Sequence, residues 1–270
     1  MILSGREISQ TIIENLKNKN SVNGLKLVVI SVGDNKSAMS YLNGIISKAK
    51  ILDVIVEHVN LDENINNEEY IKNIEYYNLH SDAILLFTPL PNQLDFELIS
   101  KYIEPSKDVD CLTKYNSGNF YLTTDEVVAP CTAKAVMEVF KVNNYDLTSK
   151  KVCIVGASNI VGKPLAKLML DANATVTVCN YHTIDLEEHT KVSDIVIAAC
   201  GVAKLIKKEH LKENAIVIDV GINFIDGKLC GDVDYEDCLK TTPNITPVPG
   251  GIGSITSTII FQNMSLLKKS

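Results

Sequence analysis

Short apolar runs alternate with longer amphipathic segments along this 270-residue chain. The apolar runs are rich in Val and Ile, and we predict them as strands at residues 25–32, 54–59, 83–87, 151–155, 175–179, 195–199 and 215–220. Elsewhere apolar residues recur at helical spacing, and we predict helices at residues 4–18, 38–52, 66–78, 132–143, 162–171 and 254–268. Strands that alternate with helices in this way are typical of an α/β fold with parallel sheets.

The polar stretch at residues 116–126 carries no strong periodic signal and separates the two halves of the chain. We therefore predict two α/β domains with a boundary near this stretch. In the second half, a β-branched strand at 151–155 leads through a glycine-containing turn into an amphipathic helix and a further strand at 175–179. This βαβ unit predicts a Rossmann-like, doubly wound parallel sheet, and a nucleotide domain that follows another α/β domain suggests a cleft between them.

The turn after the strand at 151–155 is a candidate binding site. It reads Gly156-x-Ser158-x-x-x-Gly162, and Pro164 occupies the first turn of the following helix, where its missing N–H costs little. A turn in this place presents a helix N-terminus to the pyrophosphate of a dinucleotide. Because the spacing differs from G-x-G-x-x-G, the two glycines are also compatible with tight strand–helix packing alone.

Three further segments combine unusual backbone with polar groups. P-L-P at 89–91 stops an apolar strand, Asp108 and Asp110 place two carboxylates in one turn, and residues 246–256 hold two prolines and three glycines before a helix. A loop of that last composition favours close approach of the backbone to a ligand. Taken singly, the prolines also fit a simple strand end, and the carboxylates also fit solvated turn residues.

Composition excludes several classes of function. The formal net charge is −7, and Arg6 is the only Arg among the 26 basic residues, so the basic footprint of a nucleic-acid-binding protein is absent. No stretch reaches the ~18 consecutive apolar residues of a membrane span. The seven cysteines form no C-x-x-C pair and share no ligand spacing with the five histidines. We therefore expect reduced thiols in a cytoplasmic protein, no metal site, and neither nucleic-acid nor membrane partners.

One family matches the order and separation of these motifs. The motifs are V-G-D at 32–34 followed by Tyr41, P-L-P at 89–91, K-D-V-D at 107–110, P-C-T at 130–132, G-x-S-x-I-V-G-x-P at 156–164, D-V-G-I-N at 219–223, G-D-V at 231–233 and T-P-V-P-G-G-I-G at 246–253. In them the chain resembles the methylenetetrahydrofolate dehydrogenase/cyclohydrolase (FolD) family over essentially its whole length. The resemblance implies a homodimer. Each subunit would contain a folate-binding catalytic domain, residues 1–121 completed by 248–270, and a dinucleotide-binding Rossmann-like domain, residues 122–247.

The resemblance also implies two reactions of one-carbon metabolism. The dehydrogenase moves a hydride from 5,10-methylenetetrahydrofolate to NAD or NADP and leaves a methenyl cation, so alignment of the two carbons is the main requirement. The cyclohydrolase adds water to that cation to give 10-formyltetrahydrofolate, which requires a proton acceptor.

By position in the motifs, the resemblance assigns roles to individual residues. Tyr41 would stack on the pterin and Asp110 would accept hydrogen bonds from its amino group, and these two are the candidate catalytic residues. The loop that borders folate would contain Pro249, Gly250 and Gly251. The dinucleotide would contact Gly156, Ala157, Ser158, Ile160, Val161, Asn180, Tyr181, His182, Thr183 and Ile222.

Three positions around the cyclohydrolase chemistry depart from the family pattern. The hydrolytic lysine four residues after Tyr41 is Ile45, its glutamine partner is Phe87, and the serine three residues before Tyr41 is Ala38. Because Ile cannot exchange a proton and Phe cannot hold a water, we predict a dehydrogenase with weak or absent cyclohydrolase activity. Two alternatives stay open. One is a fully bifunctional enzyme that uses Lys48, which lies about 4.5 Å farther along the helix axis than Ile45. The other is a catalytically silent folate- or dinucleotide-binding protein.

The loop that would receive the adenosine ribose departs as well. NADP-dependent members of the family typically carry Arg where this chain has Ala157, and Ser and Lys or Arg where it has Tyr181 and His182. Because Asn180 suits a free 2′-hydroxyl, we predict NAD rather than NADP. Against this, the Asp or Glu that NAD enzymes commonly use after this strand is missing, and a protonated His182 would pair with a 2′-phosphate.

Overall fold

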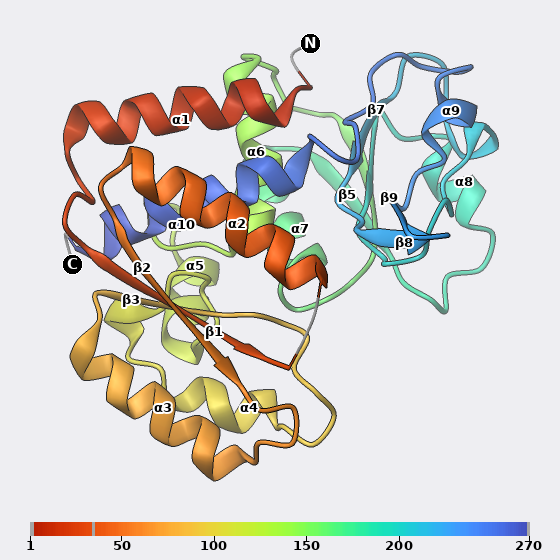
Figure 1. Ribbon diagram of the computed structural model, residues 1–270. Coiled ribbons are helices and arrows are strands. Elements are labelled where there is room, and N and C mark those ends of the chain that lie inside the picture. Colours follow the sequence, from red (N-terminus) through yellow and green to blue (C-terminus); the bar gives the residue numbers. More distant parts are fainter. Residues whose placement is uncertain (1–2, 34–35, 269–270) are drawn as a thin grey trace. The chain divides into compact units, whose positions relative to one another are not determined.

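The computed structural model describes residues 3–33 and 36–268, which form two compact units, each built around its own sheet (Figure 1). The three-stranded unit contains Thr11–Cys131 and the chain from Ser257 on, and the four-stranded unit contains the chain up to Gln10 and Thr132–Thr256. The predicted α/β class, with two domains and parallel sheets, is therefore confirmed. Asp34, the last residue of the V-G-D motif, lies outside the described residues.

In the three-stranded unit all strands run parallel, in the order β2-β1-β3. The strands are β1 (Lys26–Val32), β2 (Ile55–Leu61) and β3 (Ala83–Leu86). The helices are α2 (Lys36–Ile51), α3 (Asn67–His80), α4 (Phe96–Ile99) and α5 (Lys114–Leu122), with 3₁₀ turns at Ser100–Tyr102 and Pro105–Lys107. Parts of α1 (Gly5–Lys19) and α10 (Ile252–Leu267) complete the unit. Figure 1 shows α2 and α3 on opposite faces of this sheet.

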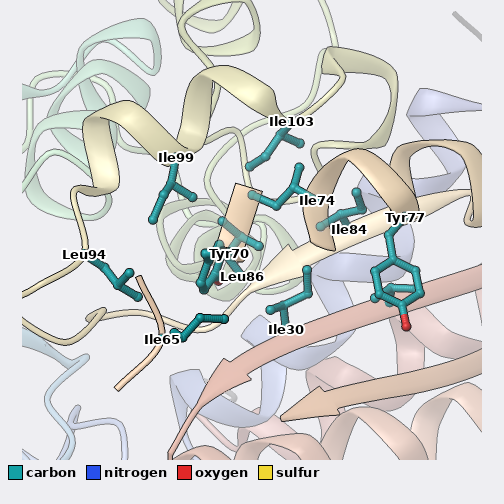
Figure 2. Close-up of a cluster of buried hydrophobic side chains, with 11 residues drawn as sticks. Ile30, Ile65, Tyr70, Ile74, Tyr77, Ile84, Leu86, Leu94, Ile99 and Ile103 are labelled. Atoms are coloured by element: carbon teal, nitrogen blue, oxygen red, sulfur yellow. The ribbon is translucent and has the colours of Figure 1, made fainter. Parts of the chain in front are cut away.

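A cluster of buried apolar side chains joins this sheet to α3 (Figure 2). Ile84 and Leu86 of β3 and Ile30 of β1 point into it, because alternate residues of a strand face the same side of the sheet. Tyr70 and Ile74, one turn apart on α3, meet them from the helix. Each such side chain contributes ~1.5–3 kcal/mol on burial, so the cluster fixes the strand ends that carry candidate residues.

In the four-stranded unit the main sheet is parallel, in the order β5-β4-β6-β7. Its strands are β4 (Lys151–Val155), β5 (Thr175–Cys179), β6 (Ile195–Ala198) and β7 (Ile216–Asp219), and an antiparallel hairpin adds β8 (Asn223–Ile225) and β9 (Lys228–Cys230). Its helices are α6 (Cys131–Val142) from Thr132 on, α7 (Gly162–Asp171), α8 (Leu186–Thr190) and α9 (Tyr235–Cys238), with a 3₁₀ turn at Lys208–His210. The predicted βαβ unit is β4-α7-β5, a Rossmann-like arrangement.

Every predicted strand and helix is present, with ends within two residues of the predicted ones. Although residues 116–126 show no strong periodicity, α5 covers their first part: the Thr113 hydroxyl oxygen accepts the N–H of Asn116 at 3.2 Å, and only Asn116 and Phe120 of this helix are buried. The sequence prediction missed the β8–β9 hairpin, although Asp226-Gly227, both with positive φ, is a strong hairpin signal. No helix within residues 3–33 and 36–268 is long and apolar enough to span a bilayer.

Candidate active site

An aromatic pair and a carboxylate lie together in the three-stranded unit. Tyr41 on α2 and Phe87, directly after β3, have ring centroids 5.5 Å apart with the planes tilted by 43°. Burial raises the pKa of Tyr41 well above its usual value, and the neighbouring Cys131 and Asp110 raise it further. The structure therefore brings the two predicted folate-contacting residues, Tyr41 and Asp110, into one electrostatic environment.

Asp110 is held at the start of a helix. Its Oδ1 accepts the backbone N–H of Cys131, the first residue of α6, at 2.8 Å, and a helix N-terminus favours a negative charge. Burial nevertheless raises the pKa of Asp110 to about 6, because desolvation outweighs the Cys131 N–H, and the charge of Asp108 adds to the rise. Sequence reasoning missed the role of Cys131, although the P-C-T motif at 130–132 marked its position.

The second carboxylate of this turn has a different role. Asp108 is almost entirely buried, and its oxygens accept the N–H groups of Leu112 at 2.9 Å and Thr113 at 2.8 Å and the side-chain amide of Asn116 at 3.0 Å. It thus organises the start of α5 and has its acceptor capacity occupied by the chain itself. Of the two turn carboxylates, Asp110 is the one suited to a ligand.

The positions that depart from the family pattern are apolar in the structure as well. Ile45, one turn after Tyr41 on α2, is completely buried, and Ala38 is half-buried. Lys48 is half-buried and donates to the Ser257 hydroxyl of α10 at 2.7 Å, and burial lowers the pKa of its ammonium group. Lys48 thus lies two turns after Tyr41 on α2, one turn beyond the position of Ile45.

The turn after β4 in the four-stranded unit leads into the N-terminus of α7. Gly156 has φ of +126°, and a Cβ there would overlap the carbonyl of Ala199, while a Cβ on Gly162 would overlap the carbonyl of Gly156. The glycines thus serve tight packing, as one interpretation of the motif required. The same packing leaves Ser158 and Ile160 exposed and Ala157 and Val161 half-buried in front of the helix. In this turn Pro164 has no N–H, and the N–H groups of Lys163 and Leu165 donate to the carbonyls of Ser158 and Val161 at 3.0 and 2.9 Å. The positive end of the helix dipole still lies at this turn, so the turn is also compatible with a pyrophosphate.

The loop after β5 closes on itself. The side-chain oxygen of Asn180 accepts the N–H of His182 at 2.9 Å, and the hydroxyl oxygen of Thr183 accepts the N–H of Asn180 at 2.9 Å. Tyr181 is 91% exposed, and its ring lies 3.8 Å from that of His182. Gly156 donates its N–H to the Cys179 carbonyl at 2.9 Å, so this loop lies next to the α7 turn. None of the loop residues 180–183 carries a permanent positive charge.

The remaining predicted residues lie in two other loops of the four-stranded unit, one after β7 and one before α10. Ile222 follows β7 and is 58% exposed. Pro249, Gly250 and Gly251 precede α10; the Val248–Pro249 peptide is cis, and the Gly250 carbonyl accepts the N–H of Gly5 at 2.8 Å. The structure thus places the predicted dinucleotide residues at the carboxyl ends of parallel strands, where α/β sheets bind ligands.

Known proteins resemble this chain over nearly its whole length. Two family models match it: "Tetrahydrofolate dehydrogenase/cyclohydrolase, catalytic domain" over residues 3–110 and "Tetrahydrofolate dehydrogenase/cyclohydrolase, NAD(P)-binding domain" over residues 130–270. The bifunctional protein FolD of Sulfurovum sp. (strain NBC37-1) is 44% identical over 259 residues, or 93% of this chain and 90% of that protein.

Two solved structures have the same fold at similar length. The bifunctional FolD enzyme of Campylobacter jejuni is 37% identical, with a TM-score of 0.90 over 99% of this chain and 98% of that one. The Trypanosoma brucei methylenetetrahydrofolate dehydrogenase-cyclohydrolase, solved with NADP cofactor and an inhibitor, is 29% identical, with a TM-score of 0.93 over 100% of this chain and 97% of that one.

Proposed function

Because this chain belongs to the tetrahydrofolate dehydrogenase/cyclohydrolase family, we propose that it oxidises 5,10-methylenetetrahydrofolate to 5,10-methenyltetrahydrofolate with a nicotinamide dinucleotide as hydride acceptor. The observation that carries the proposal is the cluster of Tyr41, Phe87 and Asp110, since a flat pterin with N–H donors on its edge requires an aromatic face beside a carboxylate. Folate binding is assigned to residues 1–121 with 248–270, and dinucleotide binding to 122–247.

The chain's own residues supply binding and alignment. Tyr41 stacks on the pterin, and Asp110, fixed by the Cys131 N–H, accepts hydrogen bonds from its amino group. The N-terminus of α7 and the Ser158 hydroxyl hold the pyrophosphate, and Ile222 offers an apolar surface to the nicotinamide. The bound dinucleotide supplies the carbon that accepts the hydride. No side chain must exchange a proton in this step, because the methenyl product is a delocalised cation.

We further propose that the cyclohydrolase step is weak or absent. Addition of water to the methenyl cation requires a group that accepts the water's proton. Ile45 is completely buried and apolar, and Phe87 packs near Tyr41, so neither position supplies such a group. The three positions at which the family has polar residues for this hydrolysis are therefore all apolar here, as Ala38, Ile45 and Phe87.

A second candidate function is full bifunctionality with Lys48 as the proton acceptor. One observation favours it: the Lys48 ammonium group is half-buried, its pKa is lowered by burial, and Ser257 orients it at 2.7 Å. An amine with a lowered pKa is a better proton acceptor near neutral pH. The distance of two helical turns from Tyr41 disfavours it relative to the first proposal.

A single absorbance experiment tests the proposed reaction. With 5,10-methylenetetrahydrofolate, the purified chain is expected to form the methenyl product with NAD faster than with NADP. Methenyl product supplied alone is expected to decay at the rate seen in buffer. Enzymatic decay of that product at a rate comparable with its formation would overturn the proposal that the cyclohydrolase step is weak or absent, and no methenyl formation with either dinucleotide would indicate a silent binding protein.

The KM for folate is expected to rise about tenfold as pH falls from 7 to 5. Asp110 must be ionised to accept the pterin N–H groups, and burial raises its pKa to about 6, so the protonated form dominates below that value. Steady-state rates at saturating dinucleotide measure this change. Asp110→Asn is the matched control, with a higher KM that no longer varies over this range. A wild-type KM that is flat between pH 5 and pH 7 would contradict the assignment.

We also propose NAD as the preferred dinucleotide and a homodimer as the assembly. The loop 180–183 offers hydrogen-bonding groups but no permanent positive charge to a ribose, which suits a free 2′-hydroxyl better than a 2′-phosphate. All seven cysteines lie within the described residues and none forms a disulfide, which suits the proposed cytoplasmic location.

A further inference from the structure

Two carboxylates are buried at the carboxyl ends of β6 and β7. Asp219 is the last residue of β7, Asp232 follows β9, and both are almost completely inaccessible to solvent. Buried carboxylates are costly unless hydrogen bonds compensate them. Here the two carboxylates accept hydrogen bonds from backbone N–H groups and from the side chains of Asn223 and Cys200. No step of the activity proposed above uses either carboxylate.

The two carboxylates interlock through glycines. A Cβ on Gly231 would overlap the carboxylate of Asp219, and a Cβ on Gly221 would overlap the carboxylate of Asp232. Asp219 accepts the N–H groups of Gly221 at 3.0 Å, Asp232 at 2.9 Å and Val233 at 3.0 Å. The motifs D-V-G-I-N and G-D-V are therefore two halves of one packed unit, in which each aspartate occupies the space left by the other motif's glycine.

Asp232 extends this unit to two further segments. Its Oδ2 accepts the N–H groups of Cys200 at 2.7 Å and Gly201 at 2.9 Å, in the loop that follows β6. Its Oδ1 accepts the side-chain amide of Asn223, the first residue of β8, at 2.8 Å. One carboxylate thus ties together the loops after two neighbouring parallel strands.

Ile222 lies between the tethered residues. The backbone on its N-terminal side is held through the Gly221 N–H by Asp219, and Asn223 on its other side is held by Asp232. Its side chain is nevertheless 58% exposed. A large apolar side chain on a fixed backbone at the ligand-binding edge of a parallel sheet is suited to contact a flat ring.

We propose that Asp232 is a positioning residue for the nicotinamide end of the dinucleotide site, acting through Asn223 on Ile222 and through the Cys200–Gly201 loop. The inference rests on the proposed dinucleotide-dependent function. Affinity is expected to come mainly from the pyrophosphate and adenosine contacts elsewhere, whereas the position of the nicotinamide decides the rate of hydride transfer. Displacement of a reacting group by ~1 Å can cost ~100-fold in rate.

The test exchanges the partners of one hydrogen bond. Asn223→Asp places a carboxylate against Oδ1 of Asp232, so the two repel and Ile222 is displaced. We expect kcat to fall about 10- to 100-fold while the KM for dinucleotide and for folate change less than about threefold. The double variant Asn223→Asp/Asp232→Asn restores the bond with reversed polarity, because the new amide still accepts from Cys200 and Gly201 and donates to the new carboxylate. It is expected to recover kcat to within about threefold of wild type.

Asn214→Asp is the matched control, because it adds the same charge at an exposed residue before β7 and should leave kcat unchanged. If Asn223→Asp does not fold, Asn223→Ala removes the same bond without repulsion and should lower kcat in the same direction. The inference is overturned if kcat of the folded single variant equals that of wild type, if KM rises with kcat unchanged, or if the double variant recovers nothing.

A binding measurement separates this inference from the proposed reaction. The emission of NADH increases when its nicotinamide ring is immobilised in a shielded site, and this is measured without folate. We expect the increase in wild type and in the double variant, and binding without the increase in Asn223→Asp. An inactive wild type would overturn the proposed reaction alone, whereas equal emission from wild type and Asn223→Asp would overturn the positioning role alone.

Discussion

Replacing Ile45 with Lys and Phe87 with Gln together is expected to raise the rate of methenyltetrahydrofolate hydrolysis by about 100-fold, since a positioned acid–base group contributes ~10²–10⁴. Position 45 lies one turn after Tyr41 on α2, so a lysine there points to the face that carries the proposed pterin contact. Position 87 lies beside the Tyr41 ring, with centroids 5.5 Å apart, so a glutamine amide there can hold the lysine or a water. Formation of methenyl product in the absorbance assay serves as the reference activity and should be retained.

The two substitutions are expected to depend on each other. Ile45 is completely buried, so Ile45→Lys alone would bury an ammonium group without a partner, which lowers the pKa of that group and destabilises the fold. The glutamine supplies that partner, so the double variant should hydrolyse more than the sum of the single variants. Hydrolysis that stays at the buffer rate in a folded, dehydrogenase-active double variant would contradict the proposal that Ile45 and Phe87 make the cyclohydrolase step weak or absent.

Lys48→Met is the control that separates the two candidate functions. It keeps an unbranched side chain only one atom shorter and removes the amine that donates to Ser257. Under the first proposal the slow hydrolysis of wild type is unchanged by it, and the gain in the double variant also survives it. Loss of an enzymatic hydrolysis rate in Lys48→Met would instead identify Lys48 as the proton acceptor.

Most of the fold could be predicted from the sequence because nearby residues determine where its main strands and helices form. Strand 151–155 and helix 162–171 match the structure in full, since a β-branched run and an amphipathic helix with Pro164 in its first turn are unambiguous. α5 was missed because only two of its residues are buried, which leaves no periodic signal. The short β8–β9 hairpin was missed although its Asp226-Gly227 turn is visible in the sequence.

The site was less predictable, because its contacts join residues far apart in the chain. Nothing local distinguishes Asp108 from Asp110. The difference arises because Asp108 accepts the N–H groups of Leu112 and Thr113 just before α5, whereas Asp110 accepts the N–H of Cys131. The bond from Lys48 to Ser257 spans 209 positions, and that from Cys200 to Asp232 spans 32. Sequence patterns place such residues on elements, but only the packing of those elements brings them into contact.

Ala157→Arg combined with His182→Lys is expected to shift the ratio of kcat/KM for NADP to that for NAD by about 10- to 100-fold toward NADP. Each charge-assisted hydrogen bond to the 2′-phosphate is worth ~1.5–3 kcal/mol, and ~1.4 kcal/mol is tenfold in affinity. Both positions lie shortly past the ends of the neighbouring strands β4 and β5, and the Gly156 N–H bond to the Cys179 carbonyl keeps those ends together. Two cations there would meet the same phosphate.

The shift should respond to salt in a way that identifies its cause. His182 is exposed, so salt screens the added attraction to the 2′-phosphate. Raising the ionic strength from about 0.01 M to about 0.5 M should therefore abolish most of the shift toward NADP, while kcat/KM for NAD stays nearly constant. Val192→Lys with Asn214→Lys adds the same net charge at exposed residues of the four-stranded unit and should leave the ratio unchanged. A ratio that stays fixed in Ala157→Arg/His182→Lys, or a wild type that already strongly prefers NADP, would contradict the assignment, because the loop 180–183 would then recognise the phosphate without a permanent positive charge.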